Sequence, residues 1–586
     1  MHKELSRQNV RTRGASPWCP VCIEIVGSPG KIIFSAVLSV LAASAVLAPT
    51  SGLTQSIWTG GGVNNNWSAN ANWSNNAAPI FPTGLTFAGS TRLANSNDLT
   101  GITVSGITFD SAAGAFVLDG NDLTLAGDIG FNGNPATPIT QTVNLNLALS
   151  ASETIDTPTN GNLTLGGDLT SSVDTSLIKL DSGTLTLGGT NTIQSWDLNG
   201  GTTMLTGNTT INGDGGRIYV ADGDAVADSQ ATLDIQPGAV LNITGTFGDT
   251  FVIGRDSGSG TVNQNGGTFT FNPGNNGTIW LGATGNSATR SAYNMNAGLL
   301  DMSGNTLGIG LGAGVLITGL VNQASGVITN VGNLWVGWGN GYGVYTLSGG
   351  SIYIGATGVT TTGSYAVNLG GGTVGAETSW SSSLNLNLTN LNGSVTFNPA
   401  GNTITLSGAL SGNGGLTVAG GGTLELAGAN TYTGDTIVNA GSTLQLDVTG
   451  NSVGAFRLAN GALVNLNFSG TYVVAGLYTN GVALSVGTYN VGNLPGFITG
   501  SGSLQVASSI PTTPTKISFT LSGTSLAINW PVSYQGWVLQ AQTNSLSKGL
   551  STNWVDVPNS ANVTSVTMAI NPTNPTVFYR LRYPAQ

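Results

Sequence analysis

Residues 420–446 read GGGTLELAGANTYTGDTIVNAGSTLQL, and apolar residues alternate there with polar ones in short runs separated by Gly, Asn and Thr. Alternation with a period of two is typical of a β-strand that buries one face. Gly and Asn tolerate the positive φ angles that tight turns require. This stretch therefore predicts short strands joined by tight turns, with few charged side chains.

The composition extends this prediction to the whole chain. Its 586 residues include 89 Gly, and 7% of them are charged, whereas about 25% is usual in a soluble domain. Hydrophobic residues make up 40% of the chain, which is enough to bury a core. A helical protein would carry Glu, Lys and Arg on its surface. Because Ser, Thr and Asn supply most of the polar residues here, we expect an all-β fold.

A strand that ends in glycine recurs along the middle of the chain. The copies are FVIG at 251–254, IWLG at 279–282, LGIG at 307–310, LWVG at 334–337 and IYIG at 352–355. The spacing of their closing glycines is nearly constant from Gly254 to Gly337, and the last interval, from Gly337 to Gly355, is shorter. A longer pattern overlies this repeat: TVNQNGG at 261–267 leads to Trp280 and Tyr293, and LVNQASG at 320–326 leads to Trp335 and Tyr345.

A short period made of strands and turns predicts a β-solenoid, in which each coil stacks on the next. With about 400 residues at roughly 25 per coil, we expect on the order of 16 coils and a rod of roughly 75 Å. Neutral Thr and Asn side chains on the outside can stack without the repulsion of aligned charges. A β-propeller is the alternative, but its blades are about 40–50 residues long.

The first 45 residues have the pattern of a secretory signal peptide. Five basic residues precede the apolar run IIFSAVLSVLAASAVLA at 32–48, and Ala43-Ser44-Ala45 offers a cleavage site. A membrane anchor is the alternative. The CPVC pair at 19–22 and His2 lie upstream of that site, so the mature chain has neither Cys nor His.

The mature composition excludes several kinds of chemistry. A chain without Cys and His has no disulfides, no zinc site with the usual ligands, and no thiol or imidazole catalysis. The ten basic and 24 acidic residues that remain give a net charge of −14, and such a surface repels nucleic acid and anionic lipid. We expect no cofactor, no nucleic-acid partner and no transmembrane segment in the mature chain.

The rest of the chain divides by composition. We expect an N-terminal cap and first strands at 46–130, solenoid repeats at 131–507, a Pro/Thr linker at 508–516, and a small β-sandwich at 517–586. Within the first segment, Trp58, Trp67 and Trp73 favour a cap over the open end of the solenoid. The alternative is that these rings stack on sugars.

Residues 414–446 closely resemble the autotransporter-associated β-strand repeat, also called the passenger-associated transport repeat, with Gly421 through Thr436 as the matching core and GSTLQL as its close. The opening at 57–79 looks like the start of large exported proteins that carry this repeat, and the tail is similar to a fibronectin-like module. The resemblance implies a right-handed parallel β-helix, export across the bacterial envelope, and a structural or adhesive, adhesin-like passenger at the cell surface. Such proteins end in a membrane β-barrel of about a dozen strands, for which a tail of about 70 residues has no room. The repeat carries no catalytic residues.

One acidic cluster is a candidate for chemistry. Asp214, Asp222, Asp224 and Asp228 lie close together with Arg217 in NGDGGRIYVADGDAVADS at 212–229. Asp249, Arg255 and Asp256 follow about one coil later. Converging carboxylates could hold Ca²⁺ or cleave a glycan, and Asp222 and Asp224 would share a face if their segment is extended. Asp-Gly pairs are also ordinary turn residues, and we expect neither a metal site nor a catalytic site.

Three aromatic residues are candidates for binding glycans. Trp280, Trp335 and Tyr353 occupy related strands of the repeat, and they would line one outer face if they point outward. If they point inward, they belong to the core. We therefore expect a non-catalytic exported surface or matrix protein, with extracellular glycans or cell-envelope components as possible partners. The alternative is an exported protein that binds or degrades a polysaccharide through the Asp cluster and the aromatic residues.

Overall fold

The computed structural model describes residues 55–172, 174–213, 218–245, 251–273, 277–283, 289–312, 317–506 and 514–583. The expected signal peptide, the CPVC pair, Asp214, Arg217 and Asp249 lie outside these ranges. Besides strands, the described chain contains four short 3₁₀ turns: η1 (Asn70–Asn72), η2 (Ser74–Asn76), η3 (Val532–Tyr534) and η4 (Ser560–Asn562). None of the described segments forms a helix long and apolar enough to cross a membrane.

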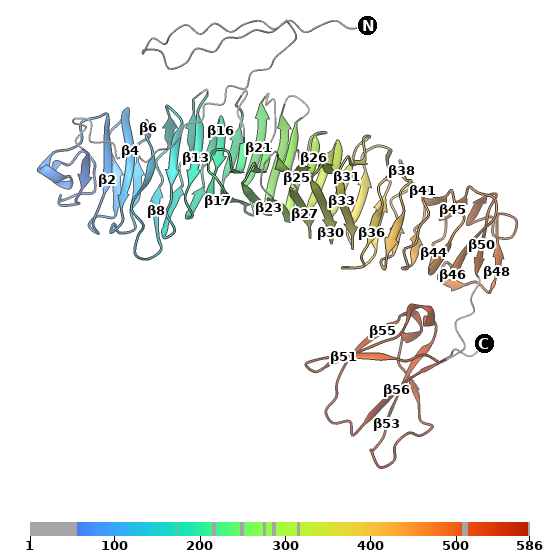
Figure 1. Cartoon of the computed structure of the whole chain (residues 1–586). Coiled ribbons are helices and arrows are strands. Elements are labelled where there is room, and N and C mark those ends of the chain that lie inside the picture. Colours follow the sequence, from blue (N-terminus) through green and yellow to red (C-terminus); the bar gives the residue numbers. More distant parts are fainter. Residues whose placement is uncertain are drawn as a thin grey trace, which may run out of the picture. The chain divides into compact units, whose positions relative to one another are not determined.

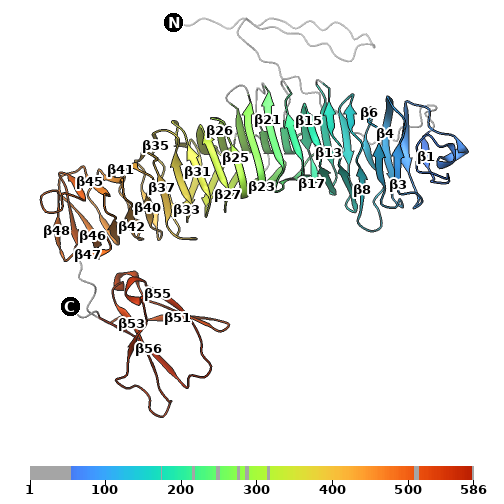
Figure 2. The same ribbon diagram turned by 180° about the vertical axis from the view of Figure 1, so that it is seen from behind.

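Residues 56–506 form a parallel β-solenoid of about 16 turns, as the sequence predicts. Figures 1 and 2 show its strands stacked one beside another along a single axis. Nearly all of its strands pair in parallel with the equivalent strand of the next coil, which divides the wall of the solenoid into three faces. Phe251 lies beside Ile279 in the next coil, whereas Leu424 lies beside Leu444, which is a shorter step along the chain. Coil length therefore varies along the solenoid.

The strands of the three faces are as follows. The first face contains β1 (Ser56–Trp58), β2 (Thr83–Phe87), β4 (Ile102–Asp110), β7 (Ile129–Asn132), β10 (Glu153–Asp156), β13 (Ser176–Leu180), β16 (Ser195–Leu198), β19 (Ile218–Asp222), β22 (Phe251–Arg255), β24 (Thr278–Ala283), β26 (Thr306–Gly312), β29 (Asn333–Gly339) and β32 (Val359–Thr360), continued by β35 (Trp380–Ser382), β38 (Thr403–Leu406), β41 (Gly422–Leu426), β43 (Ser442–Leu446), β45 (Leu463–Leu466) and β49 (Ile498–Gly500). The second face contains β3 (Ala94–Asn97), β5 (Val117–Gly120), β8 (Ile139–Val143), β11 (Gly161–Leu165), β14 (Thr184–Leu187), β17 (Gly200–Leu205), β20 (Gln230–Ile235), β23 (Ser259–Pro273), β25 (Arg290–Asp301), β27 (Thr318–Gln323), β30 (Tyr342–Leu347), β33 (Ser364–Leu369), β36 (Leu386–Leu388) and β39 (Leu410–Gly412). The third face contains the N-terminal part of β4, β6 (Leu123–Leu125), β9 (Leu147–Leu149), β12 (Leu169–Ser171), β15 (Thr190–Ile193), β18 (Asn208–Ile211), β21 (Val240–Gly245), the C-terminal parts of β23 and β25, β28 (Val327–Val331), β31 (Ser351–Ile354), β34 (Thr373–Ala376), β37 (Val395–Asn398), β40 (Leu416–Val418), β42 (Thr436–Val438), β44 (Asn451–Leu458), β46 (Thr471–Thr479) and β50 (Ser503–Val506).

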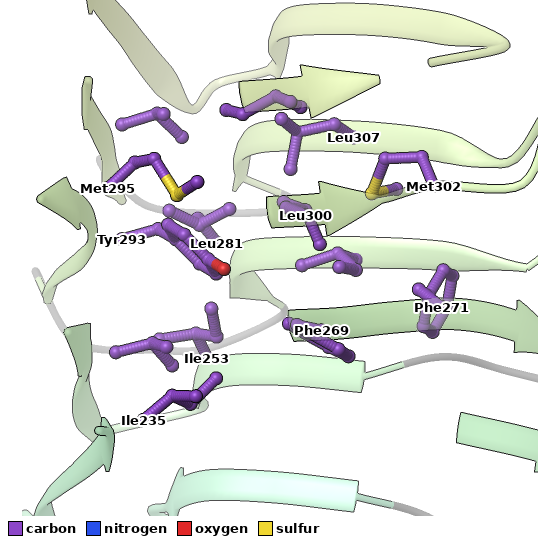
Figure 3. Close-up of a cluster of buried hydrophobic side chains, with 14 of the residues drawn as sticks. Ile235, Ile253, Phe269, Phe271, Leu281, Tyr293, Met295, Leu300, Met302 and Leu307 are labelled. Atoms are coloured by element: carbon purple, nitrogen blue, oxygen red, sulfur yellow. The ribbon is translucent and has the colours of Figure 1, made fainter. Parts of the chain in front are cut away.

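The core is the interior of the solenoid. Figure 3 shows apolar side chains from neighbouring coils, among them Ile253, Leu281 and Phe269, pointing into this interior. Their alternation with outward residues explains the period-two pattern of the sequence. Burying a side chain of this size contributes about 1.5–3 kcal/mol, and stacking repeats that contribution coil after coil. The solenoid is therefore stabilised mainly by contacts between adjacent coils.

The longer sequence repeat places two polar pairs inside this apolar core. The hydroxyl of Tyr293 donates a hydrogen bond to Oε1 of Gln264 (2.5 Å), and the hydroxyl of Tyr345 donates one to Oε1 of Gln323 (2.6 Å). All four side chains are buried. Burial raises the pKa of both tyrosines well above the usual range. The repeated glutamine thus serves as the acceptor for the tyrosine of the next coil.

The strand-ending glycines also have a structural role. Gly254, Gly282, Gly310 and Gly337 have φ angles of 74°, 71°, 74° and 81°, in the left-handed region that favours glycine. They lie one or two residues before the C-terminal ends of successive strands of the first face. Gly355 differs, because its strand pairs through Ile352 with β28 on the third face. The fifth segment therefore belongs to another row, which explains why it follows Gly337 at a shorter interval.

Both ends of the solenoid are covered. At the N-terminal end, Trp58, Trp67 and Trp73 are buried and pack edge to face. The indole of Trp67 donates to Oδ1 of Asn95 (2.7 Å), and that of Trp73 donates to the carbonyl of Trp67 (2.7 Å). Rings buried in this way form a cap and cannot stack on a sugar. At the other end, the antiparallel strands β47 (Val482–Ala483) and β48 (Gly487–Tyr489) pair with β46 and β50.

The C-terminal module consists of two three-stranded antiparallel sheets. One contains β51 (Ser518–Ser522), β52 (Ser525–Asn529) and β55 (Ser565–Ala569), and the other contains β54 (Val555–Asp556), β53 (Val538–Thr543) and β56 (Val577–Arg582). Its small core gathers residues from both sheets around Ile528, Trp530 and Leu539. The two sheets therefore pack face to face, which fits the small sandwich that the sequence predicts.

Candidate functional site

The acidic cluster forms at the end of two neighbouring strands of the first face. Strand β19 ends at Asp222 and β22 ends at Arg255, and these residues are in register across adjacent coils. Each follows a residue with positive φ, Ala221 (69°) and Gly254 (74°). Because the two strands end in the same backbone conformation, the two side chains lie side by side.

Arg255 is the centre of the cluster. Its Nη1 lies 3.0 Å from Oδ2 of Asp222, its Nη2 lies 3.1 Å from Oδ2 of Asp224, and its Nε lies 3.4 Å from Oδ2 of Asp256. The guanidinium also lies over the ring of Tyr219, 5.2 Å from its centroid. The Asp222 side chain is only 5% exposed. One partly buried cation thus pairs with three carboxylates, of which Asp222 is the buried one that most requires such a partner.

Asp214 lies outside the described residues, and the other three predicted aspartates do not act as one group. Asp222 and Asp224 meet at Arg255, but not on an extended segment, because the chain turns after Asp222 and the Asp224 backbone N–H donates to Oδ1 of Asp222 (3.0 Å). The condition for a shared strand face, an extended segment, is therefore not met, because Gly223 and Asp224 lie in a turn. Asp228 is an exposed turn residue whose N–H donates to Oγ of Ser257 (2.9 Å).

Asp197 belongs to this cluster although the sequence analysis missed it. It lies on β16, in register with Tyr219, one coil before Asp222. Burial is the main cause that raises the pKa of Asp197 to about 7, and the nearby Asp222 carboxylate acts in the same direction, whereas a hydrogen bond from Asn199 and the charge of Arg255 oppose this shift. Only the register between coils reveals its position, because nothing near it in sequence marks a site.

The cluster is arranged as a closed ion-pair network. Arg255 occupies the centre, where a metal ion would have to sit to contact the same carboxylates. Among the residues that the structure describes, no three His, Cys, Asp or Glu side chains come together as a ligand set for a metal. The geometry therefore suits joining two coils better than holding Ca²⁺.

Two of the three candidate aromatic residues share an outer surface. Trp280 and Trp335 lie on the first face, two coils apart, with ring centroids separated by 5.9 Å. A Cβ added at Gly308, in the coil between them, would overlap the indole of Trp280. Trp280 also packs against a small outer cluster of Tyr219, Val252 and Ala283.

Tyr353 lies elsewhere. It is on β31 of the third face, where its ring covers Gly375 of the next coil. The expectation that all three rings line one face was therefore wrong, because the short spacing before Tyr353 reflects a change of face. What remains is a half-buried Trp280–Trp335 pair on the outside of the solenoid.

Comparison with protein families finds the passenger-associated transport repeat at residues 416–446. This segment spans β40 to β43, where Leu416 pairs with Thr436 and Leu424 with Leu444, so it belongs to the shorter coils of the solenoid. Comparisons with curated proteins and with solved structures give no match. The repeat and the β-solenoid together fit an autotransporter passenger-like repeat protein, and such a repeat implies export or a surface location.

Proposed function

We propose that this protein is a non-catalytic, exported cell-surface or extracellular-matrix protein whose β-solenoid has a structural or adhesive role. The observation that carries the proposal is the continuity of the parallel ladder of the third face, from β4 to β50. In a stack of this kind each added coil lengthens the solenoid and extends its outer faces. The passenger repeat at 416–446 supports export as the setting for that role.

The side chains on the outside also support this proposal. On the second face, Asn263 donates to Asp234 (2.8 Å), Asn294 donates to Asn263 (2.8 Å), and Asn322 donates to Asn294 (3.0 Å). Successive coils are thus joined by a ladder of mostly neutral hydrogen bonds. The outer Asn side chains hydrogen-bond to one another between coils, and the carboxylates of the acidic cluster pair with Arg255. Both sets of interactions are consistent with a structural role and involve no substrate.

A screen of the purified chain from residue 46 tests the proposal. Polysaccharides of several classes are incubated with and without Ca²⁺, and both binding and cleavage are recorded. We expect no depolymerisation under either condition. Cleavage that is lost in Asp222→Asn, with near-ultraviolet circular dichroism showing an intact fold, would replace the proposal with a polysaccharide-degrading enzyme. The N-terminal sequence of the secreted protein tests export, and we expect it to begin near residue 46.

The Trp280–Trp335 pair favours a second candidate, which is glycan binding without cleavage. Half-buried indoles on a flat sheet can stack against sugar rings through their apolar faces. In the same screen, Trp335→Ala would then abolish binding to one polysaccharide while Tyr353→Ala, on another face, leaves it unchanged. Equal binding by both variants would remove this candidate and leave the structural role.

A further inference from the structure

A hollow of about 300 Å³ lies on the outer side of the third face, among the last coils of the solenoid. Its walls come from three successive strands, β42, β44 and β46, and from the turns that follow β44 and β46. Strand β46 continues into a hairpin with β47 at this end of the solenoid (Figure 2), and the hairpin turn at 480–481 forms one side of the hollow. Its volume lies at the lower limit for a small-molecule site.

Three outward side chains of the hollow belong to one row across successive coils. Ile437 is in register with Arg457, and Arg457 is in register with Tyr478. The guanidinium of Arg457 lies over the ring of Tyr478, 4.2 Å from its centroid, and its Nε donates to Oδ2 of Asp435 (2.7 Å). These two contacts orient the Arg457 side chain, and the ion pair with Asp435 compensates its charge.

The hollow also contains polar groups that the protein itself does not use. Within the part of the chain that the structure describes, the side-chain amides of Asn460 and Asn480 and the hydroxyl of Tyr478 form no hydrogen bond. These groups supply both donors and acceptors. Ile437 and Ala459 add apolar surface to the same lining. The hollow therefore combines neutral hydrogen-bonding groups with an apolar patch.

Charge limits the ligands that this hollow can bind. Because Arg457 is paired with Asp435, the hollow offers no uncompensated positive charge to an anion. Residues 55–506 contain six basic and 23 acidic residues, a net charge of −17, so the solenoid around the hollow also repels polyanions. A cationic ligand would lie against the guanidinium of Arg457, which repels it.

The free polar groups also disfavour a wholly apolar ligand. Such a ligand would remove the amides of Asn460 and Asn480 and the hydroxyl of Tyr478 from water without replacing their hydrogen bonds, which costs free energy. The ligand that fits is therefore uncharged, rich in hydroxyl groups, and apolar on one face. A neutral sugar has these three properties.

We propose that this hollow binds one residue of a neutral glycan. The hydroxyl groups of the sugar exchange hydrogen bonds with the amides of Asn460 and Asn480, and its C–H face lies against Ile437. This inference rests on the adhesive role proposed above, to which it gives a ligand class and a site. That site is separate from the Trp280–Trp335 pair, which lies on another face.

Saturation-transfer difference NMR with the chain from residue 46 tests this inference. The probes are three neutral tetrasaccharides, namely cellotetraose, chitotetraose and mannotetraose, and tetragalacturonate is the acidic counterpart. We expect saturable binding of at least one neutral probe and weaker binding of tetragalacturonate, because the hollow has no uncompensated positive charge.

Three variants locate the site. Ala459→Phe fills the hollow and should abolish binding of the neutral probe. Asn460→Ala removes one amide and should weaken binding by roughly two- to tenfold, the range for one neutral hydrogen bond. Asn480→Gly should have a similar effect and keeps the hairpin turn, because Asn480 has a φ of 51°, which glycine also adopts. Asn439→Ala is the control, since Asn439 is an exposed residue in the turn after β42 that does not line the hollow, and binding should be unchanged.

Thermal midpoints of these variants distinguish a loss of binding from a loss of folding. If Ala459→Phe does not fold, the two asparagine variants decide the result. Unchanged affinity in the folded variants of the hollow, with binding lost instead in Trp335→Ala, would overturn the inference and leave the adhesive role in place. Stronger binding of tetragalacturonate would overturn the assignment to a neutral sugar. If no probe binds the wild type, both the inference and the adhesive role fail, and only the structural role remains.

Discussion

Ala221 occupies the position that glycine fills in the following coils of the first face. Its φ is 69°, close to the angles of Gly254 and Gly282 at the equivalent positions. For a residue with a Cβ this conformation costs about 1–2 kcal/mol. The positive φ of Ala221 sets the direction of the chain at Asp222, the last residue of β19. The strained residue therefore lies next to the ion-pair cluster.

Replacing this alanine should therefore stabilise the protein. We expect Ala221→Gly to raise the free energy of unfolding by roughly 0.5–1 kcal/mol, because relief of strain exceeds the added chain entropy of glycine. Gly282→Ala is the control with the opposite expected effect, a loss of stability. Gly282 has a φ of 71°, which disfavours alanine, and the added Cβ would also clash with the Ile317 side chain. Urea midpoints measure both effects. A lower midpoint for Ala221→Gly would contradict the assigned strain.

The burial of Asp197 predicts a pH dependence. Its pKa is raised to about 7 in the folded protein, against about 3.9 in an unfolded chain. Between these values the folded state binds more protons, so this contribution to stability is complete below pH 4 and is lost as the pH rises through 7. Asp197→Asn should remove that loss and stabilise the protein by about 1–3 kcal/mol at pH 8.

Thermal midpoints measured from pH 4 to pH 8 check this expectation. The wild type should lose stability relative to Asp197→Asn as the pH rises across this window. Asp174→Asn, at an exposed position, should follow the wild type. Parallel curves for wild type and Asp197→Asn would show that Asp197 is ionised throughout.

At the scale of elements, the buried tyrosine–glutamine pairs link one coil to the next. Tyr293→Phe leaves Oε1 of Gln264 buried without its donor, and such a group costs about 1–3 kcal/mol. We expect a matching loss from Tyr345→Phe at Gln323, because the two pairs have the same geometry. Urea denaturation of the two variants measures the losses. If neither change lowers stability, the pairs do not hold the coils together.

The strands themselves were predictable because their pattern is local. Alternation and strand-ending glycines identified the solenoid, and the buried tryptophans were recognised as an end cap. The face to which a strand belongs was harder to predict, because the coils become shorter between Phe251 and Leu444. Gly355 and Tyr353 were assigned to the wrong row for this reason. Asp197 was missed because the environment of an outward residue is made by neighbouring coils.

At the scale of the molecule, the charged residues are distributed unevenly along the chain, which the overall composition does not reveal. The outer ladder of Asn side chains joins neighbouring coils through neutral hydrogen bonds, and Arg255 pairs with the carboxylates of the acidic cluster. The positive charge collects instead in the C-terminal module. The stacked neutral side chains and the small C-terminal sandwich were predicted from local sequence patterns. The positive charge of the sandwich was not predicted, because it appears only when charges are counted separately for each part of the chain.

The most direct test of the whole account is a set of distances along the second face. Thr164, Asp234 and Thr346 belong to one outward row, joined through successive paired residues. The chain from residue 46 has no native cysteine, so nitroxide pairs can be placed at 164 and 234 or at 164 and 346 and measured by double electron–electron resonance. With about 4.8 Å per coil, three and seven steps predict separations of about 14 and 34 Å, apart from the reach of the labels. Distances that fail to grow with the number of coils would contradict the stacked solenoid on which the proposed role depends.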